Sequence, residues 1–455
     1  MRRLATVKLQ PSKVQEEILF ELAQVTAIIW NKLNYQRLKQ FKEFGKIDFN
    51  GTEKEAYHEF KNRIGGSTVQ QLARKNTEAW RGFFSLNKKK KAGELLEWLK
   101  PKPPRFIKGR KLFVIPLRND QYRVKGNVLE LRRLGKFGKL EVQFKGRIHL
   151  KGKQERLEIV YDDVKRKWYA HISFKVEEKF RKGWVKVPRQ SPGSLIAGID
   201  LGVNNLIAVY VENGESILVN GRPLESIAFY WQKRIAEYQS KLNKSEAKRS
   251  RKLKRMHEKS KLQAKHYINT IVRHTVKKLY ELGVSKIVVG YPKEIARNSD
   301  KGKKQNFLLS HVWRFNTVIQ RLRDVAEEYG TQVVVVDEAF TSQSRPSCGQ
   351  RHSNARFVRG LFKCRREGVV MNADLVGAFN ILRKLKTITP SLLGLTAGRG
   401  NWPRTRPGGF GEHSLSGSLM RTPQTSCPWQ GVKQEPSPFR AGRRPELNFF
   451  ILLAM

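Results

Sequence analysis

The chain has 455 residues, which is long enough for several domains, and 39% of them are hydrophobic, which is enough for buried cores. It carries 90 Lys and Arg against 40 Asp and Glu, a formal net charge of +50. An excess of this size attracts polyanions, so we expect a nucleic-acid partner, although ribosomal and membrane-surface proteins share the trait.

The first part of the chain changes from a helical to a strand-like pattern. Apolar side chains from Val14 to Leu33 recur on one helix face, and polar helical sequence continues to about residue 99, with a break at Gly65 and Gly66. From residue 112 to 176, short runs with period-2 alternation are separated by turns. This pattern indicates an all-β module, and we expect a small barrel.

After Gly193 the pattern becomes that of a mixed sheet. Three strands are predicted at 196–201, 206–211 and 217–219, and then a long helical stretch, a strand at 286–290, a helix at 307–329, a strand at 332–337 and a helix at 372–386. This order of elements is that of an RNase H-like fold. Residues 387–455 are rich in Gly, Pro, Ser and Arg, so we expect them to be disordered.

The helical stretch is strongly basic. Between Lys233 and Lys278 it holds sixteen Lys and Arg against three Glu. A solvated helix face is one interpretation, and contact with a phosphate backbone is the one that we favour.

The cysteines and the apolar runs of the sequence indicate in which cellular compartment we expect the protein. Cys348, Cys364 and Cys427 give no disulfide framework and are typical of a reducing environment. The N-terminus lacks the apolar core of a signal peptide, and no apolar run reaches the roughly 18 residues of a membrane span. We therefore expect a cytoplasmic protein without a membrane partner.

Two aspartates occupy positions that an RNase H-like fold brings together. Asp200 lies in an otherwise apolar predicted strand, where a carboxylate is costly to bury without a partner such as a divalent cation. The alternative for Asp200 is a strand-end residue that caps a turn. Asp374 falls in the first turn of the last predicted helix, where the alternative is an N-cap role that stabilises the helix dipole.

Hydrolysis of a phosphodiester by two Mg²⁺ or Mn²⁺ ions about 4 Å apart requires a third carboxylate. The end of the fourth predicted strand, where we expect it, holds Gly290. The candidates are Glu294 and Glu338, with Asp337 as a possible substitute for its neighbour. We favour Glu338 because it ends an apolar strand that should lie beside the strand of Asp200, and strand ends hold side chains more rigidly than loops.

Four sequence blocks carry a family resemblance. They lie at 198–205, 337–342, 359–364 and 372–381, and they resemble the signature blocks of the TnpB/OrfB proteins, which are relatives of the type V CRISPR effectors. The resemblance spans about residues 5–385. It implies a transposon-encoded, RNA-guided DNA endonuclease that binds guide RNA and double-stranded DNA. Asp200, Glu338 and Asp374 would hold its Mg²⁺ or Mn²⁺.

The resemblance also implies an α+β multidomain fold. The expected parts are a β-barrel domain at 1–190 with a helical insertion at about 13–99, a RuvC-like nuclease domain at 194–340 and 369–386, a zinc-ribbon insert at 341–368, and the tail at 387–455.

The expected zinc ribbon is incomplete. Four ligands are normally supplied by two Cys-x-x-Cys pairs, but here each pair retains one cysteine, Cys348 and Cys364. His352 could substitute for one ligand, and Glu367 is a poor fourth. We expect a degenerate site that holds zinc weakly or not at all.

A binding protein is the competing class. An RNA-guided or plain DNA-binding repressor that no longer cuts would keep the charge and the fold, and Gly290 and the incomplete cysteine pairs favour it. A decayed remnant of a mobile element is the third interpretation.

Overall fold

The computed structural model describes most of the chain up to residue 385. The described residues are 1–95, 99–109, 112–150, 152–176, 189–191, 193–245, 250–291, 302, 306–307, 315–339, 341, 343–344, 346, 350, 356–358, 360–363 and 370–385. They form two compact units: unit 1 comprises the described residues of 1–190, 231–263 and 327–330, and unit 2 those of 191–230, 264–326 and 331–385. No helix in the described residues is both long and apolar enough to cross a membrane.

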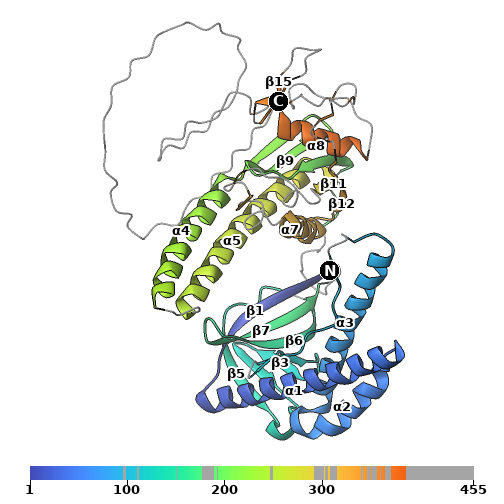
Figure 1. Cartoon of the computed structure of the whole chain (residues 1–455), viewed down its shortest axis with the longest axis vertical. Coiled ribbons are helices and arrows are strands. Elements are labelled where there is room, and N and C mark those ends of the chain that lie inside the picture. The colour runs from blue at the N-terminus through green and yellow to red at the C-terminus, as the bar shows by residue number, and fades with distance from the viewer. Residues whose placement is uncertain are drawn as a thin grey trace. The chain divides into compact units, whose positions relative to one another are not determined.

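Unit 1 contains a seven-stranded antiparallel sheet in the order β2-β6-β7-β1-β5-β4-β3 (Figure 1). Its strands are β1 (Arg2–Gln10), β2 (Ile115–Leu117), β3 (Tyr122–Lys125), β4 (Val128–Leu131), β5 (Leu140–Lys145), β6 (Lys153–Asp162) and β7 (Lys167–Lys175). The alternating strands predicted after residue 112 are present, and β1 is an addition that we did not predict. Among the described strands β2 and β3 form the edges of the sheet, so its closure into a barrel stays a prediction.

Three helices pack with this sheet, namely α1 (Lys13–Phe44), α2 (Phe49–Ile64) and α3 (Gly66–Lys91). Ser12 and Gln15 form a capping box that starts α1. The predicted break between helices is at Gly65, whose φ of 87° suits glycine and whose Cβ would lie 2.1 Å from the carbonyl oxygen of Arg133.

A buried arginine joins the three helices. Arg37 of α1 donates to Thr52 Oγ1 of α2 at 3.0 Å, and to Asn76 Oδ1 and the Ala73 carbonyl of α3 at 2.8 and 3.2 Å. Burial lowers the pKa of this guanidinium to about 10. The charge is therefore held by neutral acceptors that belong to two different helices, α2 and α3.

A buried carboxylate is the centre of a second polar cluster in unit 1. Glu130 of β4 is 1% exposed and forms ion pairs with Lys125, Arg132 and Lys139. Hydrogen bonds from Lys125 and Arg132 are the main cause that lowers the pKa of Glu130 to about 2.

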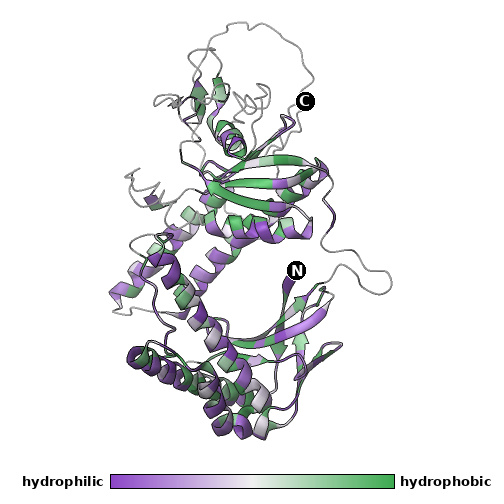
Figure 2. Cartoon of the chain, turned by 90° about the vertical axis from the view of Figure 1, so that its right-hand side faces the viewer, coloured by the Kyte–Doolittle hydropathy of each residue, from purple (hydrophilic) through white to green (hydrophobic). Residues whose placement is uncertain are grey.

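Unit 2 contains a five-stranded sheet in the order β10-β9-β8-β11-β12. Its strands are β8 (Leu195–Asp200), β9 (Asn205–Val211), β10 (Ser216–Asn220), β11 (Val284–Tyr291) and β12 (Gln332–Asp337), and they are largely hydrophobic (Figure 2). The first three strands are antiparallel, whereas β11 is parallel to both β8 and β12. The predicted element order is present, but the strand that ends before Glu338 does not lie beside that of Asp200, because β11 pairs with both and separates them.

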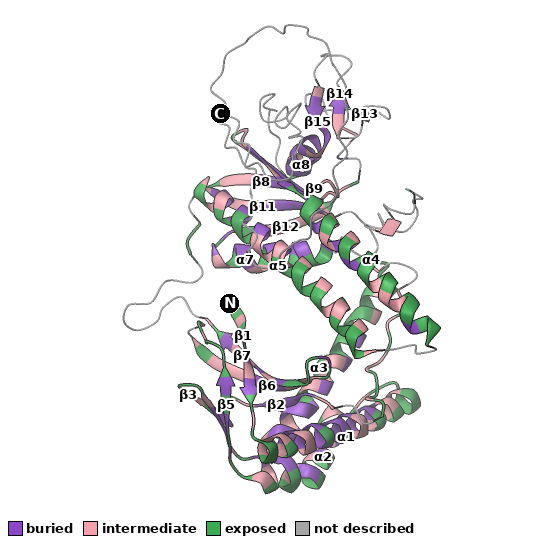
Figure 3. Cartoon of the chain, turned by 90° about the vertical axis from the view of Figure 1, so that its left-hand side faces the viewer, coloured by how far each residue is buried: buried purple, intermediate pink, exposed green. Residues whose placement is uncertain are grey.

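Helices cover both faces of this sheet. The helices at these faces are α5 (Arg251–Glu281), α7 (Phe315–Glu328) and α8 (Ala373–Arg383). Helix α4 (Arg222–Lys244) begins in unit 2, and residues 231–263 of α4 and α5 belong to unit 1. Within unit 2, α8 packs on β8 and β9 at one face, while α5 and α7 lie at the opposite face (Figures 1 and 3). Figure 3 shows α8 largely buried, and Leu375, Ala378, Phe379 and Leu382 have no exposed surface.

A small sheet lies before α8 in the chain. It consists of β13 (Arg356–Val358), β14 (Leu361–Lys363) and β15 (Val370–Asn372), which pair antiparallel. Phe362 and Met371 are buried in the same hydrophobic cluster as α8. Cys348, His352, Cys364 and Glu367 lie outside the described residues, so the zinc-site prediction stays a prediction.

Candidate active site

Asp200 lies at the end of β8, directly against α8. It is 7% exposed, and a Cβ at Gly377 of α8 would lie 2.7 Å from its Oδ2 atom. A Cβ at Gly198 of β8 would lie 2.1 Å from the carbonyl oxygen of Ala378. These two glycines therefore allow helix and strand to approach closely enough for the Asp200 carboxylate to rest on the helix.

Asp374 lies in the first turn of α8 but does not cap it. The cap is Asn372, whose Oδ1 accepts from the Asp374 and Leu375 amides at 3.0 and 3.3 Å. The Asp374 carboxylate instead accepts a hydrogen bond at Oδ2 from Asn205 Nδ2 of β9, at 2.8 Å. Because Asp374 and Gly377 are three residues apart, Asp200 and Asp374 lie near the same face of α8.

Glu338 follows the last residue of β12 and reaches toward β11. A Cβ at Gly290 of β11 would lie 3.4 Å from Glu338 Cγ, and 2.5 Å from Ile381 Cδ1 of α8. The Glu338 side chain thus lies over the strand end at which we expected a carboxylate and found glycine. Its backbone is held by Thr341, whose N–H and Oγ1 both donate to the Glu338 carbonyl.

The three acids surround one end of the sheet, but their carboxylates are not gathered into one cluster. Within the described ranges, no three Asp, Glu, His or Cys side chains lie close enough together to hold a metal ion. Carboxylate oxygens are the ligands that Mg²⁺ and Mn²⁺ prefer, so the donor type fits these ions. A site shared by the three acids therefore stays a prediction.

Of the two remaining candidates for the third carboxylate, the structure describes Asp337 but not Glu294. Asp337 is exposed, and its Oδ1 accepts from the Ala339 amide at 3.0 Å, which gives it a local role in the turn. Glu294 lies outside the described residues.

"TnpB-like protein ORF457" of Acidianus two-tailed virus is 35% identical over 409 residues, which are 84% of this chain and 86% of that protein. The chain belongs to the TnpB-like family. The family model OrfB_IS605, described as "Probable transposase", matches residues 171–296, and the model of the Cas12f1-like TNB domain matches residues 315–381. These segments contain Asp200 in the first and Glu338 and Asp374 in the second.

The TnpB-like chain is also similar to Cas12f1, a CRISPR-associated endodeoxyribonuclease. The protein from Sulfoacidibacillus thermotolerans is 29% identical over 237 residues, which are 49% of this chain and 52% of that protein. A solved Cas12f1–sgRNA–target DNA complex matches with a TM-score of 0.57 and 15% identity over 81% of this chain and 83% of that chain, which shows a shared fold. The resemblance inferred from the four sequence blocks is confirmed.

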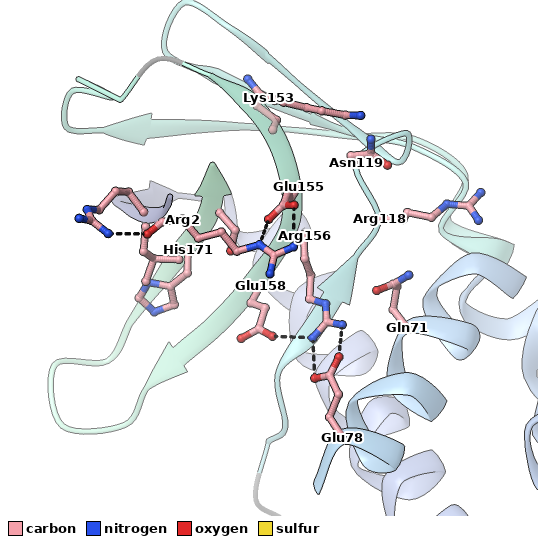
Figure 4. A pocket seen from close by; sticks show the side chains of 14 residues that line it. Arg2, Gln71, Glu78, Arg118, Asn119, Lys153, Glu155, Arg156, Glu158 and His171 are labelled. Atoms are coloured by element: carbon pink, nitrogen blue, oxygen red, sulfur yellow. Dashed lines mark hydrogen bonds and ion pairs between the residues drawn. The ribbon is translucent and has the colours of Figure 1, made fainter. Parts of the chain in front are cut away.

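Unit 1 of the TnpB-like chain has a basic pocket of about 780 Å³ (Figure 4). It lies between strands β1, β6 and β7, helix α3 and the loop at 118–119, and its cationic lining residues are Arg2, Arg3, Arg118, Lys153 and Arg156. Sequence patterns did not identify this pocket, because its residues come from distant segments.

Two glutamates form ion pairs with Arg156, which lines this pocket. Arg156 donates to both carboxylate oxygens of Glu78 at 2.7 and 3.1 Å, and lies 3.9 Å from Glu158 (Figure 4). The hydrogen bonds with Glu78 raise the pKa of Arg156 and, reciprocally, lower the pKa of Glu78. An anionic ligand would have to compete with Glu78 for this guanidinium.

Proposed function

We propose that this TnpB-like chain is an RNA-guided DNA endonuclease of a mobile element. The proposed active site lies in unit 2, which we assign as a RuvC-like, RNase H-like nuclease fold, and the proposed ligands of Mg²⁺ or Mn²⁺ are Asp200, Glu338 and Asp374. The observation that carries the proposal is the position of Glu338 over Gly290. It supplies a carboxylate at the end of β11, the strand beside that of Asp200, where the chain has none of its own.

In the proposed reaction the protein holds and orients the carboxylates that bind the metal ions. Bound divalent ions would position the attacking water and stabilise the leaving oxygen of the phosphodiester. Asn205 orients Asp374 through a 2.8 Å hydrogen bond, and the contact of Asp200 with Gly377 sets how close the first acid lies to the helix. In the proposed site, unit 2 would supply the backbone positions of all three carboxylates.

Guide RNA and double-stranded DNA are the proposed partners. Support comes from the net charge of +50, from the family, and from the fold shared with a protein solved in complex with sgRNA and target DNA. Sequence specificity would come mainly from base pairing with the guide, while basic surfaces such as the unit 1 pocket contact the backbone. Sequencing of RNA that co-purifies with the full-length chain identifies the guide and supplies the target for cleavage assays.

Charge removal at single carboxylates tests the site. Asp200→Ala and Asp374→Ala should abolish Mg²⁺-dependent cleavage while target affinity stays within about twofold. Glu338→Gln should also abolish cleavage, and Glu294→Gln should retain most of it. Loss of cleavage in Glu294→Gln but not in Glu338→Gln would move the third ligand to residue 294.

Relocating the third carboxylate tests the role of Glu338 more sharply. A glutamate introduced by Gly290→Glu should partly restore cleavage to Glu338→Gln, provided that Ile381→Ala makes room for the new Cβ, which would otherwise lie 2.5 Å from Ile381 Cδ1. The matched control is Gly290→Gln in the same background, which should restore nothing.

The competing function is a nucleic-acid-binding repressor that does not cut. Gly290 and the incomplete cysteine pairs favour it. Wild-type protein loaded with its own guide that binds target with high affinity and leaves it intact in both Mg²⁺ and Mn²⁺ would establish that function instead.

A further inference from the structure

The segment that follows β12 is held by side chains of α8. Asn380 donates from Nδ2 to the carbonyl oxygens of Thr341 and Ser344, at 2.7 and 2.8 Å. Arg383 donates to the Pro346 carbonyl at 2.9 Å, and Lys384, just after the helix, donates to the carbonyls of Asp337 and Ala339. The C-terminal half of α8 thus provides donors to backbone carbonyls that lie beyond the end of the sheet.

Asn380 is linked to Glu338 through one intermediate residue. Thr341 is 3% exposed, and it donates to the Glu338 carbonyl from its N–H at 3.2 Å and from its Oγ1 at 2.9 Å. Asn380 is 5% exposed and binds the Thr341 carbonyl from the other side. Three residues therefore form a continuous hydrogen-bonded path from the middle of α8 to the backbone of Glu338.

This path holds Glu338 just beyond the end of the β11–β12 ladder. The β11–β12 ladder ends with the pair Tyr291 and Asp337, so the Glu338 backbone lies beyond the last parallel register. A buried amide whose two hydrogens are both accepted has one allowed orientation, and removing it leaves two carbonyl oxygens without those donors.

The same helix also carries Asp374 and contacts Asp200 at Gly377. A donor on α8 that fixes the Glu338 backbone therefore sets the spacing of Glu338 from the other two acids. A metal-binding side chain must be held within a fraction of an ångström, so this spacing matters to the site.

We propose that Asn380 is a positioning residue for Glu338 and acts through Thr341. This inference rests on the proposed function, because it assigns Asn380 a part in the carboxylate site of the nuclease. Asn380 itself touches no reacting atom.

The test uses the full-length chain with Asn380→Leu, which removes both donors at similar size and without adding charge. Thr341→Val removes only the Oγ1 donor, and Thr341→Ser keeps it. Asn31→Leu is the matched control, because Asn31 makes a similar amide contact in unit 1, with Nδ2 donating to the Ile107 carbonyl at 2.9 Å.

Three measurements are compared with wild type: hydrogen exchange of the peptide at 337–346, Mn²⁺ binding to the free chain by electron paramagnetic resonance, and the cleavage rate at saturating target. For Asn380→Leu we expect faster exchange in that peptide, Mn²⁺ affinity lowered several-fold, and a cleavage rate lowered about 10- to 100-fold, with target affinity unchanged. Thr341→Val should show a smaller loss, Thr341→Ser should recover wild-type values, and Asn31→Leu should leave exchange, Mn²⁺ affinity and rate unchanged.

Two results would overturn the inference. One is faster exchange in Asn380→Leu with wild-type Mn²⁺ affinity, since the contact would then be merely structural. The other is unchanged exchange at 337–346. If Asn380→Leu does not fold, the comparison of Thr341→Val with Thr341→Ser decides by the same criteria. If the wild-type chain binds Mn²⁺ but cuts nothing, the proposed function is refuted. The Mn²⁺ affinities of wild type and Asn380→Leu then still decide whether Asn380 positions Glu338.

Discussion

Gly377→Ala tests the site by adding one methyl group and removing no carboxylate. The new Cβ would lie 2.7 Å from Asp200 Oδ2 and 3.1 Å from its Cγ, whereas ordinary contact begins at 3.4 Å. The Asp200 carboxylate must therefore retreat by about 0.7 Å or turn away from the helix. Because a catalytic group tolerates a displacement of about 0.5 Å, and a misplacement of about 1 Å can lower a rate about 100-fold, we expect cleavage to slow about 10- to 100-fold.

The same substitution should lower the free energy of unfolding by no more than about 2 kcal/mol. Alanine is favoured over glycine in a helix interior by about 1 kcal/mol, which offsets part of the roughly 1 to 3 kcal/mol that overpacking costs. Gly82→Ala on α3 is the control, because nothing lies within 4 Å of its Cβ. It should raise the free energy of unfolding by up to about 1 kcal/mol and leave cleavage within about twofold.

The assay combines single-turnover cleavage by guide-loaded protein, target affinity and the thermal unfolding midpoint. A Gly377→Ala variant that keeps wild-type affinity and is folded at the assay temperature, but cuts about 10- to 100-fold more slowly, agrees with the reasoning. One that cuts at the wild-type rate would refute it, since the carboxylate of Asp200 would then be either elsewhere or not needed.

Three further predictions concern unit 1. The pKa of Glu130 in the folded state is about 2, below its usual 4.5, so its contribution to stability is full above pH 4.5 and is lost as the pH falls toward 2. The thermal unfolding midpoint of the wild type should therefore drop more between pH 4.5 and 2 than that of Glu130→Gln. Glu78→Gln should release Arg156 and raise the affinity for nucleic acid about two- to fivefold at low salt, while Glu59→Gln on α2 should not. If Glu78→Gln and wild type bind nucleic acid with equal affinity at low salt, the pocket binds no phosphate. Arg37→Ala should lower the free energy of unfolding by about 3 kcal/mol or more in denaturant titrations, because it leaves a cavity and unpaired buried acceptors.

Periodicity predicted the strands of the unit 2 sheet and alternating runs in unit 1, and it could have predicted one more strand. Ala5, Val7 and Leu9 alternate with exposed or half-exposed residues in β1, so the signal was present at the N-terminus. Likewise, Asn372 directly precedes the apolar run of α8 and is a typical N-cap residue. The sequence could therefore have predicted that Asn372, and not Asp374, caps the helix.

Strand order could not be predicted from local patterns. A parallel strand is placed by the crossover that precedes it, and the apolar run at 333–336 is equally compatible with a position beside β8 or beside β11. The amide contacts of Asn205 and Asn380 have no periodic signal at all, because each joins segments that are more than thirty residues apart in the chain. The basic pocket of unit 1 was missed for the same reason.

The geometry at Gly290 bears on the question of a decayed gene. Random loss of a carboxylate at the end of β11 would leave a gap there without any relation to the neighbouring strand. Instead, a Cβ at Gly290 would lie only 2.5 Å from Ile381 Cδ1, so the space beside this glycine is filled by a side chain of α8. Glu338 Cγ would lie 3.4 Å from the same Cβ, which is ordinary contact. In the site that we propose, the Asn380–Thr341–Glu338 path holds the third carboxylate at this end of the sheet, so we interpret Gly290 as the former place of an acid that has moved.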